Sequence, residues 1–147
     1  MKTSLCIVAR TLSTRLPNKA LLNIIDNICL LDLLILRLKT EFNARTITLA
    51  TTKLKQDDIL EQIANKHNIN FFRGEEKNVL DRLINSSSKF TDCQNIVRIT
   101  GDNPLTDPFV LKKMILDHEN NNYDHTFTRS IPIGTRAEVL SLDFLKF

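Results

Sequence analysis

Short apolar runs alternate with segments of helical spacing along most of this 147-residue chain. Runs rich in β-branched and apolar residues, bounded by polar loop residues, predict buried strands. The predicted strands cover residues 4–9, 46–50, 70–73 and 95–100, with a further candidate at 123–128. Leucines at helical spacing fill residues 30–38, which predicts a helix buried over most of its circumference.

Helix-starting residues precede three further segments of helical spacing. Asp57 or Asp58 can cap a helix that carries one apolar stripe, and Asn78 can cap the next. Pro108 suits the first turn of a fourth helix. Beyond a predicted turn at 132–134, the chain continues as an apolar stretch over residues 137–145.

Strands that alternate with helices predict an α/β fold with three layers, in which a mostly parallel sheet has helices on both faces. In open sheets of this kind, ligands bind outside the carboxyl ends of the strands. Polar clusters at 10–19, 51–58 and 101–107 follow predicted strands, so we expect them to meet at one rim. We find no linker, and therefore expect one domain over residues 1–147.

The composition indicates which classes of partner and which cellular compartment to expect. A formal net charge of +3, evenly spread, does not indicate a nucleic-acid partner. Three cysteines without a CxxC pair favour buried thiols over a disulfide framework or a zinc site. The N-terminal apolar run is cut by Arg10, and residues 28–38 fall short of the roughly 20 residues of a membrane span. We expect a soluble, cytoplasmic protein with no membrane partner.

The cluster at residues 9–19 brings Arg10, Arg15 and Lys19 together directly after a buried strand. Such a loop can aim its cations and backbone N–H groups at a triphosphate, and Pro17 would stiffen it. The alternative is a solvated basic loop, which the spacing alone does not exclude.

Asp102 follows a predicted strand and Gly101, whose missing side chain would let a ligand approach closely. A carboxylate in that place can hold Mg²⁺, which prefers few protein ligands together with phosphate oxygens. The alternative is an Asx turn closed by Pro104. A third cluster combines Ala50-Thr51-Thr52 with Asp57 and Asp58; its hydroxyls and an aspartate could bind a base edge, although a helix cap explains the aspartates better.

Taken together, these blocks resemble the cytidylyltransferase family that includes the spore coat polysaccharide biosynthesis protein F group and the acylneuraminate and 3-deoxy-manno-octulosonate cytidylyltransferases. The first group is the most similar. The matching positions, in family order, are Ala9-Arg10, Ser13, Arg15-Leu16-Pro17, Lys19, Ala50-Thr51-Thr52, Asp58, Phe72-Arg73-Gly74, Val79-Leu80, Arg82, Arg98-Ile99-Thr100-Gly101-Asp102-Asn103-Pro104-Leu105, Pro132, Gly134 and Glu138-Val139.

The resemblance implies a fold of the nucleotide-diphospho-sugar transferase type and transfer of CMP from CTP to a sugar or sugar acid, with release of pyrophosphate. It implies catalytic roles for Arg10, Lys19 and Asp102, of which Asp102 would bind the Mg²⁺ cofactor. Substrate contacts are implied for Asn103 and Glu138. The implied nucleotide-binding residues are Ala9, Arg10, Ser13, Arg15, Lys19, Thr51, Asp58, Arg82, Thr100 and Asp102.

The chain departs from the family pattern in two ways. Asn18 stands where family members often have Gly, and Leu12 where they have a small residue; Asn18 can still adopt a positive φ. Family members also usually continue beyond Phe147, into a part that supplies sugar contacts, dimer contacts and often a second metal carboxylate.

We therefore expect a C-terminally truncated domain with little transferase activity alone and with exposed apolar faces at Leu30–Leu38 and 137–145. A homodimer is compatible with the resemblance. The alternatives are a non-catalytic or truncated nucleotide-binding remnant, or a nucleotidyltransferase that uses another nucleoside triphosphate.

Overall fold

A computed structural model describes residues 2–12, 16–132 and 134–146. Each predicted strand and helix is present, with bounds within about two residues of those expected. The strands are β1 (Thr3–Val8), β2 (Asn23–Ile25), β3 (Ile28–Cys29), β4 (Ile47–Thr52), β5 (Asn70–Gly74), β6 (Asn95–Thr100), β7 (His125–Phe127) and β8 (Glu138–Ser141). The helices are α1 (Leu30–Leu38), α2 (Asp58–His67), α3 (Val79–Ser86), α4 (Pro108–Asn121) and α5 (Leu142–Leu145), with short 3₁₀ turns η1 (Lys19–Leu21), η2 (Ala44–Thr46) and η3 (Lys55–Asp57).

The central sheet has six strands in the order β5-β4-β1-β6-β8-β7. Its first four strands pair in parallel, as the alternation of strands and helices predicts. In the register, Val8 of β1 lies opposite Ala50 of β4 and Thr100 of β6. The carboxyl ends of these three strands therefore meet at one rim, and the polar segments that follow them start side by side.

The far edge of the sheet is antiparallel, which the pattern of alternation did not predict. Strand β8 pairs antiparallel with β6 and with β7. The apolar stretch that begins near Ala137 forms this strand and then the one-turn helix α5. A separate small hairpin, β2–β3, precedes α1 and was also not predicted. The fold is therefore a mostly parallel α/β sheet with an antiparallel edge.

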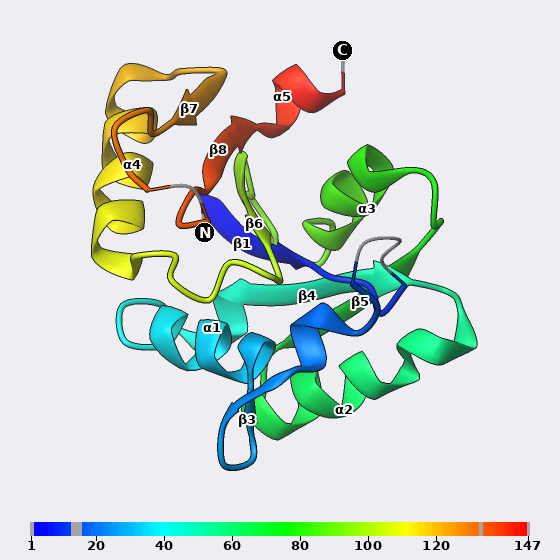
Figure 1. Cartoon of the computed structure of the whole chain (residues 1–147). Coiled ribbons are helices and arrows are strands. Elements are labelled where there is room, and N and C mark those ends of the chain that lie inside the picture. The colour runs from blue at the N-terminus through cyan, green and yellow to red at the C-terminus, as the bar shows by residue number, and fades with distance from the viewer. Residues whose placement is uncertain (1, 13–15, 133, 147) are drawn as a thin grey trace.

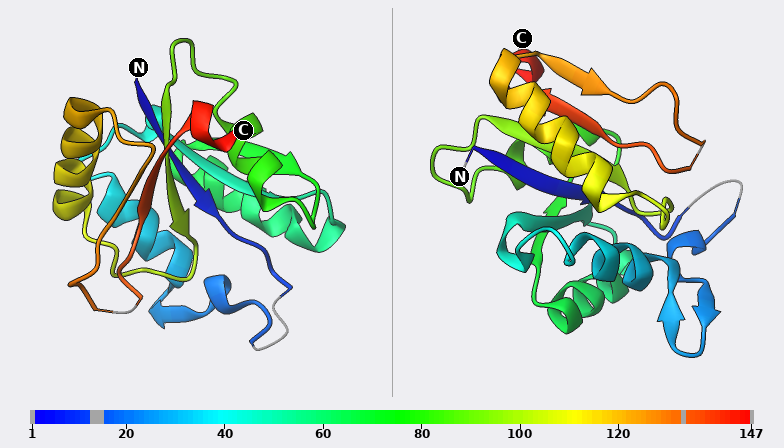
Figure 2. Two further views of the ribbon diagram at one scale, coloured as in Figure 1. Left: turned by 90° about the horizontal axis from the view of Figure 1, so that it is seen from above. Right: turned by 90° about the vertical axis from the view of Figure 1, so that its left-hand side faces the viewer.

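Helices cover both faces of the sheet, giving the three expected layers (Figures 1 and 2). On one face, α1, α2 and α4 pack against alternate side chains of the strands, including Leu5, Ile47 and Val97. On the other face, α3 and α5 pack against a smaller set that includes Cys6 and Ile96. Because successive strand residues point to opposite faces, each buried strand supplies both layers of the core.

Local sequence signals explain most of the helix starts. Asn78 caps α3 by accepting from the Asp81 amide, and Asp107 caps α4, which begins at Pro108. Asp57 occupies the N-cap position of α2, but its side chain makes no capping hydrogen bond, so the predicted cap is wrong for this residue.

The structure contradicts most of the expectation of exposed apolar faces, although Leu36 of α1 and Phe144 of the C-terminal stretch are exposed. On α1, Leu31, Leu34 and Leu38 are fully buried under α2 and the sheet. In the C-terminal stretch, Ala137 and Val139 are buried in the core as well. The α1 leucines are covered by the core cluster that includes strand residues and α2, and the C-terminal stretch is covered because β8 is itself a strand of the sheet, paired with β6. No helix within the described part of the chain is long and apolar enough to cross a membrane.

Candidate functional site

A cleft of about 620 Å³ opens at the carboxyl ends of β1 and β6, on the side covered by α3. Most of its polar lining is charged, and cations outnumber carboxylates. The residues that line it are Val8, Ala9, Arg10, Lys19, Ala20, Glu76, Lys77, Val79, Arg82, Arg98, Thr100, Gly101 and Asp102. Two of the predicted polar clusters, 10–19 and 101–107, therefore contribute to one cavity.

A close approach between two strand ends shapes the base of the cleft. The Gly101 amide donates to the Val8 carbonyl, at 2.9 Å. A Cβ added at Gly101 would lie 2.7 Å from the Cβ of Ala9, so a side chain there would push the strand ends apart. From the sequence we expected this glycine to admit a ligand, whereas the contact that requires it is with Ala9.

Lys19 and Asp102 face each other across the cleft. The Lys19 ammonium donates to Asp102 Oδ2 at 3.1 Å, and both side chains are nearly half exposed. Burial acts to raise the pKa of Asp102, but hydrogen bonds and charge attraction from Lys19, together with Thr100, outweigh it and lower that pKa. Asp102 is therefore an ionised carboxylate beside a cation, at the mouth of a cleft open to solvent.

Arg82 of α3 is buried deep in the wall of the cleft. Its Nη1 donates to the backbone carbonyls of Glu75 and Glu76, while its Nε has no partner among the described residues. Gly74 makes room for it, since an added Cβ there would lie 2.5 Å from Arg82 Cγ. Burial, followed by the nearby charge of Arg10, lowers the pKa of Arg82. Two cationic side chains are thus held close together in the cleft.

Arg98 lines the cleft, although its place in the sequence predicted no role for it. It donates to Glu138 Oε2 at 3.0 Å, across the antiparallel pair β6–β8. Strand alternation could have identified it, because Arg98 lies two residues before Thr100 and must share its face. Glu138, predicted to contact substrate, reaches the cleft through this ion pair.

The other predicted residues lie outside the cleft lining. Thr51 is fully buried, and its hydroxyl donates to Asp57 Oδ2 at 3.0 Å. Asp58 pairs with Arg73 at 2.6 Å on the outer surface. Asn103 sits just past Asp102 and donates from Nδ2 to the Arg136 carbonyl at 3.3 Å. Of the 9–19 cluster, Ser13 and Arg15 lie outside the described residues.

A backbone hydrogen bond joins the two ends of the predicted phosphate loop. Asn18 has a φ of 57°, which confirms the positive φ expected where relatives often carry Gly. Its amide donates to the Thr11 carbonyl at 2.8 Å, which joins the two ends of the loop. Arg10 and Lys19 flank these joined ends and both line the cleft, where Arg10 also pairs with Glu76 at 3.8 Å.

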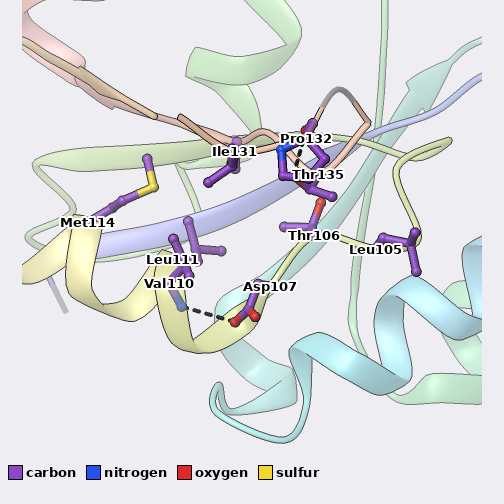
Figure 3. Close-up of a pocket in the computed structure, with 10 residues that line it drawn as sticks. Leu105, Thr106, Asp107, Val110, Leu111, Met114, Ile131, Pro132 and Thr135 are labelled. Atoms are coloured by element: carbon purple, nitrogen blue, oxygen red, sulfur yellow. Dashed lines mark hydrogen bonds between the residues drawn. The ribbon is translucent and has the colours of Figure 1, made fainter. Parts of the chain in front are cut away.

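A smaller pocket of about 190 Å³ lies on the opposite side of the sheet, against α4 (Figure 3). Leu111 and Met114 of α4 face Ile131 and Pro132 across it, and Asp107 is engaged in capping the helix. Its lining is mainly apolar and it carries no group suited to phosphate binding. The charged cleft is therefore the candidate site.

The architecture defines the chain as a nucleotidyltransferase-type α/β fold, as found in nucleotide-diphospho-sugar transferases. A cytidylyltransferase from Leptospira borgpetersenii superposes with a TM-score of 0.91 at 30% identity, over 99% of this chain and 63% of that one. A CMP-2-keto-3-deoxy-manno-octonic acid synthetase solved with CTP has the same fold, with a TM-score of 0.74 at 15% identity, over 99% of this chain and 76% of that one.

Residues 5–147 match the cytidylyltransferase family, and the chain belongs to that family. It is 36% identical over 143 residues to the spore coat polysaccharide biosynthesis protein SpsF of Bacillus subtilis, covering 95% of this chain and 59% of SpsF. It is 44% identical over 140 residues to an uncharacterised protein of Methanocaldococcus jannaschii, covering 95% of this chain and 57% of that protein. The chain thus spans less than two thirds of the length of these relatives.

Proposed function

We propose that this chain binds CTP in the cleft and transfers CMP to a sugar or sugar acid, with release of pyrophosphate. The observation that carries the proposal is the Lys19–Asp102 pair, flanked by Arg10 and Arg82, at the carboxyl ends of parallel strands. A triphosphate is the ligand with the charge to match this excess of cations. Membership of the cytidylyltransferase family supports CTP as the nucleotide.

The reaction would be attack of an acceptor oxygen on the α-phosphorus, which leaves the β- and γ-phosphates as pyrophosphate. Such a transfer needs little covalent chemistry from the protein, so positioning and charge neutralisation do most of the work. Arg10 and Lys19, which sit on the joined ends of one loop, would bind the outer phosphates and neutralise the charge that develops on the leaving pyrophosphate.

The donor set of the cleft fits Mg²⁺. Asp102 offers a hard oxygen ligand, and the Lys19 ammonium already shows that a cation is favourable beside it. No group of three or more His, Cys, Asp or Glu within the described residues could hold a metal ion by itself. Asp102 would therefore hold the ion together with nucleotide phosphates and water, where it would neutralise phosphate charge.

The acceptor would be a sugar or sugar acid used to build a glycan. The support is the pair of matched relatives named for spore coat polysaccharide biosynthesis and for 3-deoxy-manno-octulosonate cytidylyl transfer, the latter 29% identical. The Arg98–Glu138 pair at the side of the cleft offers both a cation and a carboxylate to a hydroxylated acid.

Calorimetric titration with CTP, CMP, UTP and GTP in Mg²⁺ tests the nucleotide. We expect CTP to bind best, and Asp102→Asn to weaken CTP by at least about tenfold while it preserves the shape of the residue. Glu41→Gln is the control, because Glu41 forms a comparable ion pair with Lys112 far from the cleft. Unchanged CTP affinity in Asp102→Asn would remove Asp102 from the metal site.

A second comparison locates the triphosphate tail. Lys19→Ala should weaken CTP more than CMP, because Lys19 is expected to meet the outer phosphates; Lys112→Ala is its control. An equal loss for both nucleotides would move Lys19 away from the tail. Pyrophosphate release with a panel of sugar acids and sugar phosphates then separates a transferase from a protein that only binds nucleotide.

A further inference from the structure

We propose that Asp57 is a positioning residue that holds Arg10 and Lys19 in place for the outer phosphates of the nucleotide, an inference that rests on the proposed function. Asp57 is fully buried and does not line the cleft. As a carboxylate it could not itself contact a phosphate favourably. Its effect on the nucleotide must therefore pass through the groups that it binds.

The Asp57 carboxylate joins the loop after β1 to the end of β4. Oδ1 accepts from the Thr11 amide at 2.8 Å and from the Thr11 hydroxyl at 2.6 Å. Oδ2 accepts from the hydroxyls of Thr51, at 3.0 Å, and of Thr52. An ionised carboxylate is suited to this place because it only accepts hydrogen bonds, and each of these groups has a hydrogen to donate.

Thr11 is the residue through which the carboxylate reaches both cations. Arg10 precedes Thr11 directly. The Thr11 carbonyl accepts from the Asn18 amide at 2.8 Å, and Lys19 follows Asn18. Thr11 is therefore bound to Asp57 through its amide and hydroxyl and to Asn18 through its carbonyl. It fixes both the start of the loop, next to Arg10, and the end of the loop, next to Lys19.

The charge of Asp57 also suits its surroundings. Arg10 and Arg82 repel each other at the cleft, while Asp57 and Glu76 act on Arg82 with the opposite sign, and Glu76 also pairs with Arg10. Burial tends to raise the pKa of Asp57, but the hydrogen bonds from Thr11, Thr52 and Thr51 outweigh it and lower that pKa. The buried negative charge of Asp57 thus helps to offset the repulsion between Arg10 and Arg82, together with Glu76 at the cleft.

The test compares Asp57→Ala with Asp32→Ala, which removes another buried aspartate in the α1–α2 contact. Calorimetry measures CTP and CMP affinity in Mg²⁺, and hydrogen exchange measures protection of the Thr11 amide. For Asp57→Ala we expect CTP to weaken by about tenfold and CMP by less than about twofold. The Thr11 amide should exchange at least about tenfold faster. Asp32→Ala should change neither the ratio of affinities nor this amide.

Two milder variants keep the test decisive if Asp57→Ala does not fold. Asp57→Asn retains an acceptor for the Thr11 amide and should restore part of the CTP affinity. Thr11→Val keeps the amide bond, removes the hydroxyl bond, and should weaken CTP by about threefold.

Several results would overturn the inference. Equal weakening of CTP and CMP, or a Thr11 amide that stays protected in Asp57→Ala, would show that Asp57 does not position the loop. Failure of the proposed function has a different signature, in which the unsubstituted chain binds neither nucleotide. Asp57 would then be only a structural anchor, even if the Thr11 amide loses protection.

Discussion

Two aspartates, Asp32 and Asp57, are buried in the described part of the chain, and their hydrogen-bond partners differ in kind. Asp32, in the first turn of α1, is bound by the side chains of His67, at 2.6 Å, and Lys66, at 3.0 Å, and by the Cys29 amide. Asp57, at the rim of the sheet, is bound by amide and hydroxyl groups of threonines in the described part of the chain. Asp32 joins two helices through basic side chains, and Asp57 joins the loop after β1 to the end of strand β4 through neutral donors.

The comparison shows that a buried carboxylate can stay ionised without an ion pair that neutralises its charge. Burial tends to raise both pKa values. For Asp32, hydrogen bonds from His67, Cys29 and Lys66 outweigh burial and lower its pKa to about 2. For Asp57, neutral hydrogen bonds achieve a lowering as well. Its negative charge consequently remains available to the cations of the cleft, whereas the charge of Asp32 is largely balanced locally.

The largest expected effect is a loss of stability in Asp32→Ala that leaves CTP binding nearly unchanged. Asp32→Ala removes the link between α1 and α2 and half of the capping box at Cys29, so the free energy of unfolding should fall by about 3 kcal/mol. Urea unfolding measures this loss. Calorimetry should show CTP affinity within about twofold of the unsubstituted chain, because the cleft lies on the α3 side of the sheet and the α1–α2 contact lies on the opposite side. A large loss of CTP affinity at preserved folding would contradict the comparison.

Acid should remove the contribution of Asp32. Its folded-state pKa of about 2 lies below the ordinary value of 3.8, so the unfolded chain binds more protons between these values and stability rises with pH there. The contribution of Asp32 is complete above the unfolded pKa and is lost as the pH falls through the folded one.

The measurement is the difference in unfolding free energy between the unsubstituted chain and Asp32→Asn. This difference should be constant above about pH 5 and should shrink as the pH falls from there toward about pH 2. Added salt should also reduce it, since Lys66 is more than half exposed and its attraction is screened. A difference that grows as the pH falls would reverse the assigned direction of the shift.

The alternation of apolar runs and helical segments was enough to predict the three layers and the parallel core of the sheet. Strand and helix periods are local properties, and buried strands such as Asn95–Thr100 carry them over their whole length. The antiparallel edge escaped prediction because β8 is short and lies beside β6 only through long-range pairing. The hairpin β2–β3 was missed because its side chains are largely exposed and lack a buried face.

The same limit applies to the site. Asp102 and Lys19 could be predicted because each follows a strand in a cluster of unusual chemistry, and the topology brings them within 3.1 Å. Asp57 was interpreted as a helix cap because capping is a local pattern, whereas its actual partner Thr11 lies 46 positions away. Arg82 was assigned to the nucleotide, but its burial against the backbone of Glu75 could not be read from spacing.

The smallest expected effect on stability comes from removing a single hydroxyl donor to Asp57, that of Thr51. Thr51 and Thr48 are both buried threonines of β4. The Thr51 hydroxyl donates to Asp57, while the Thr48 hydroxyl has no partner among the described residues. Valine has nearly the shape of threonine, so Thr51→Val should lower the free energy of unfolding by about 1 kcal/mol, because one donor to a buried carboxylate is lost while Thr52 remains. Thr48→Val should raise it by about 1 kcal/mol, because it removes a buried hydroxyl that lacks a hydrogen bond. Urea unfolding of both variants measures whether the free energy of unfolding falls for Thr51→Val and rises for Thr48→Val. A loss of equal size at both positions would show that Asp57 gains nothing specific from the Thr51 hydroxyl.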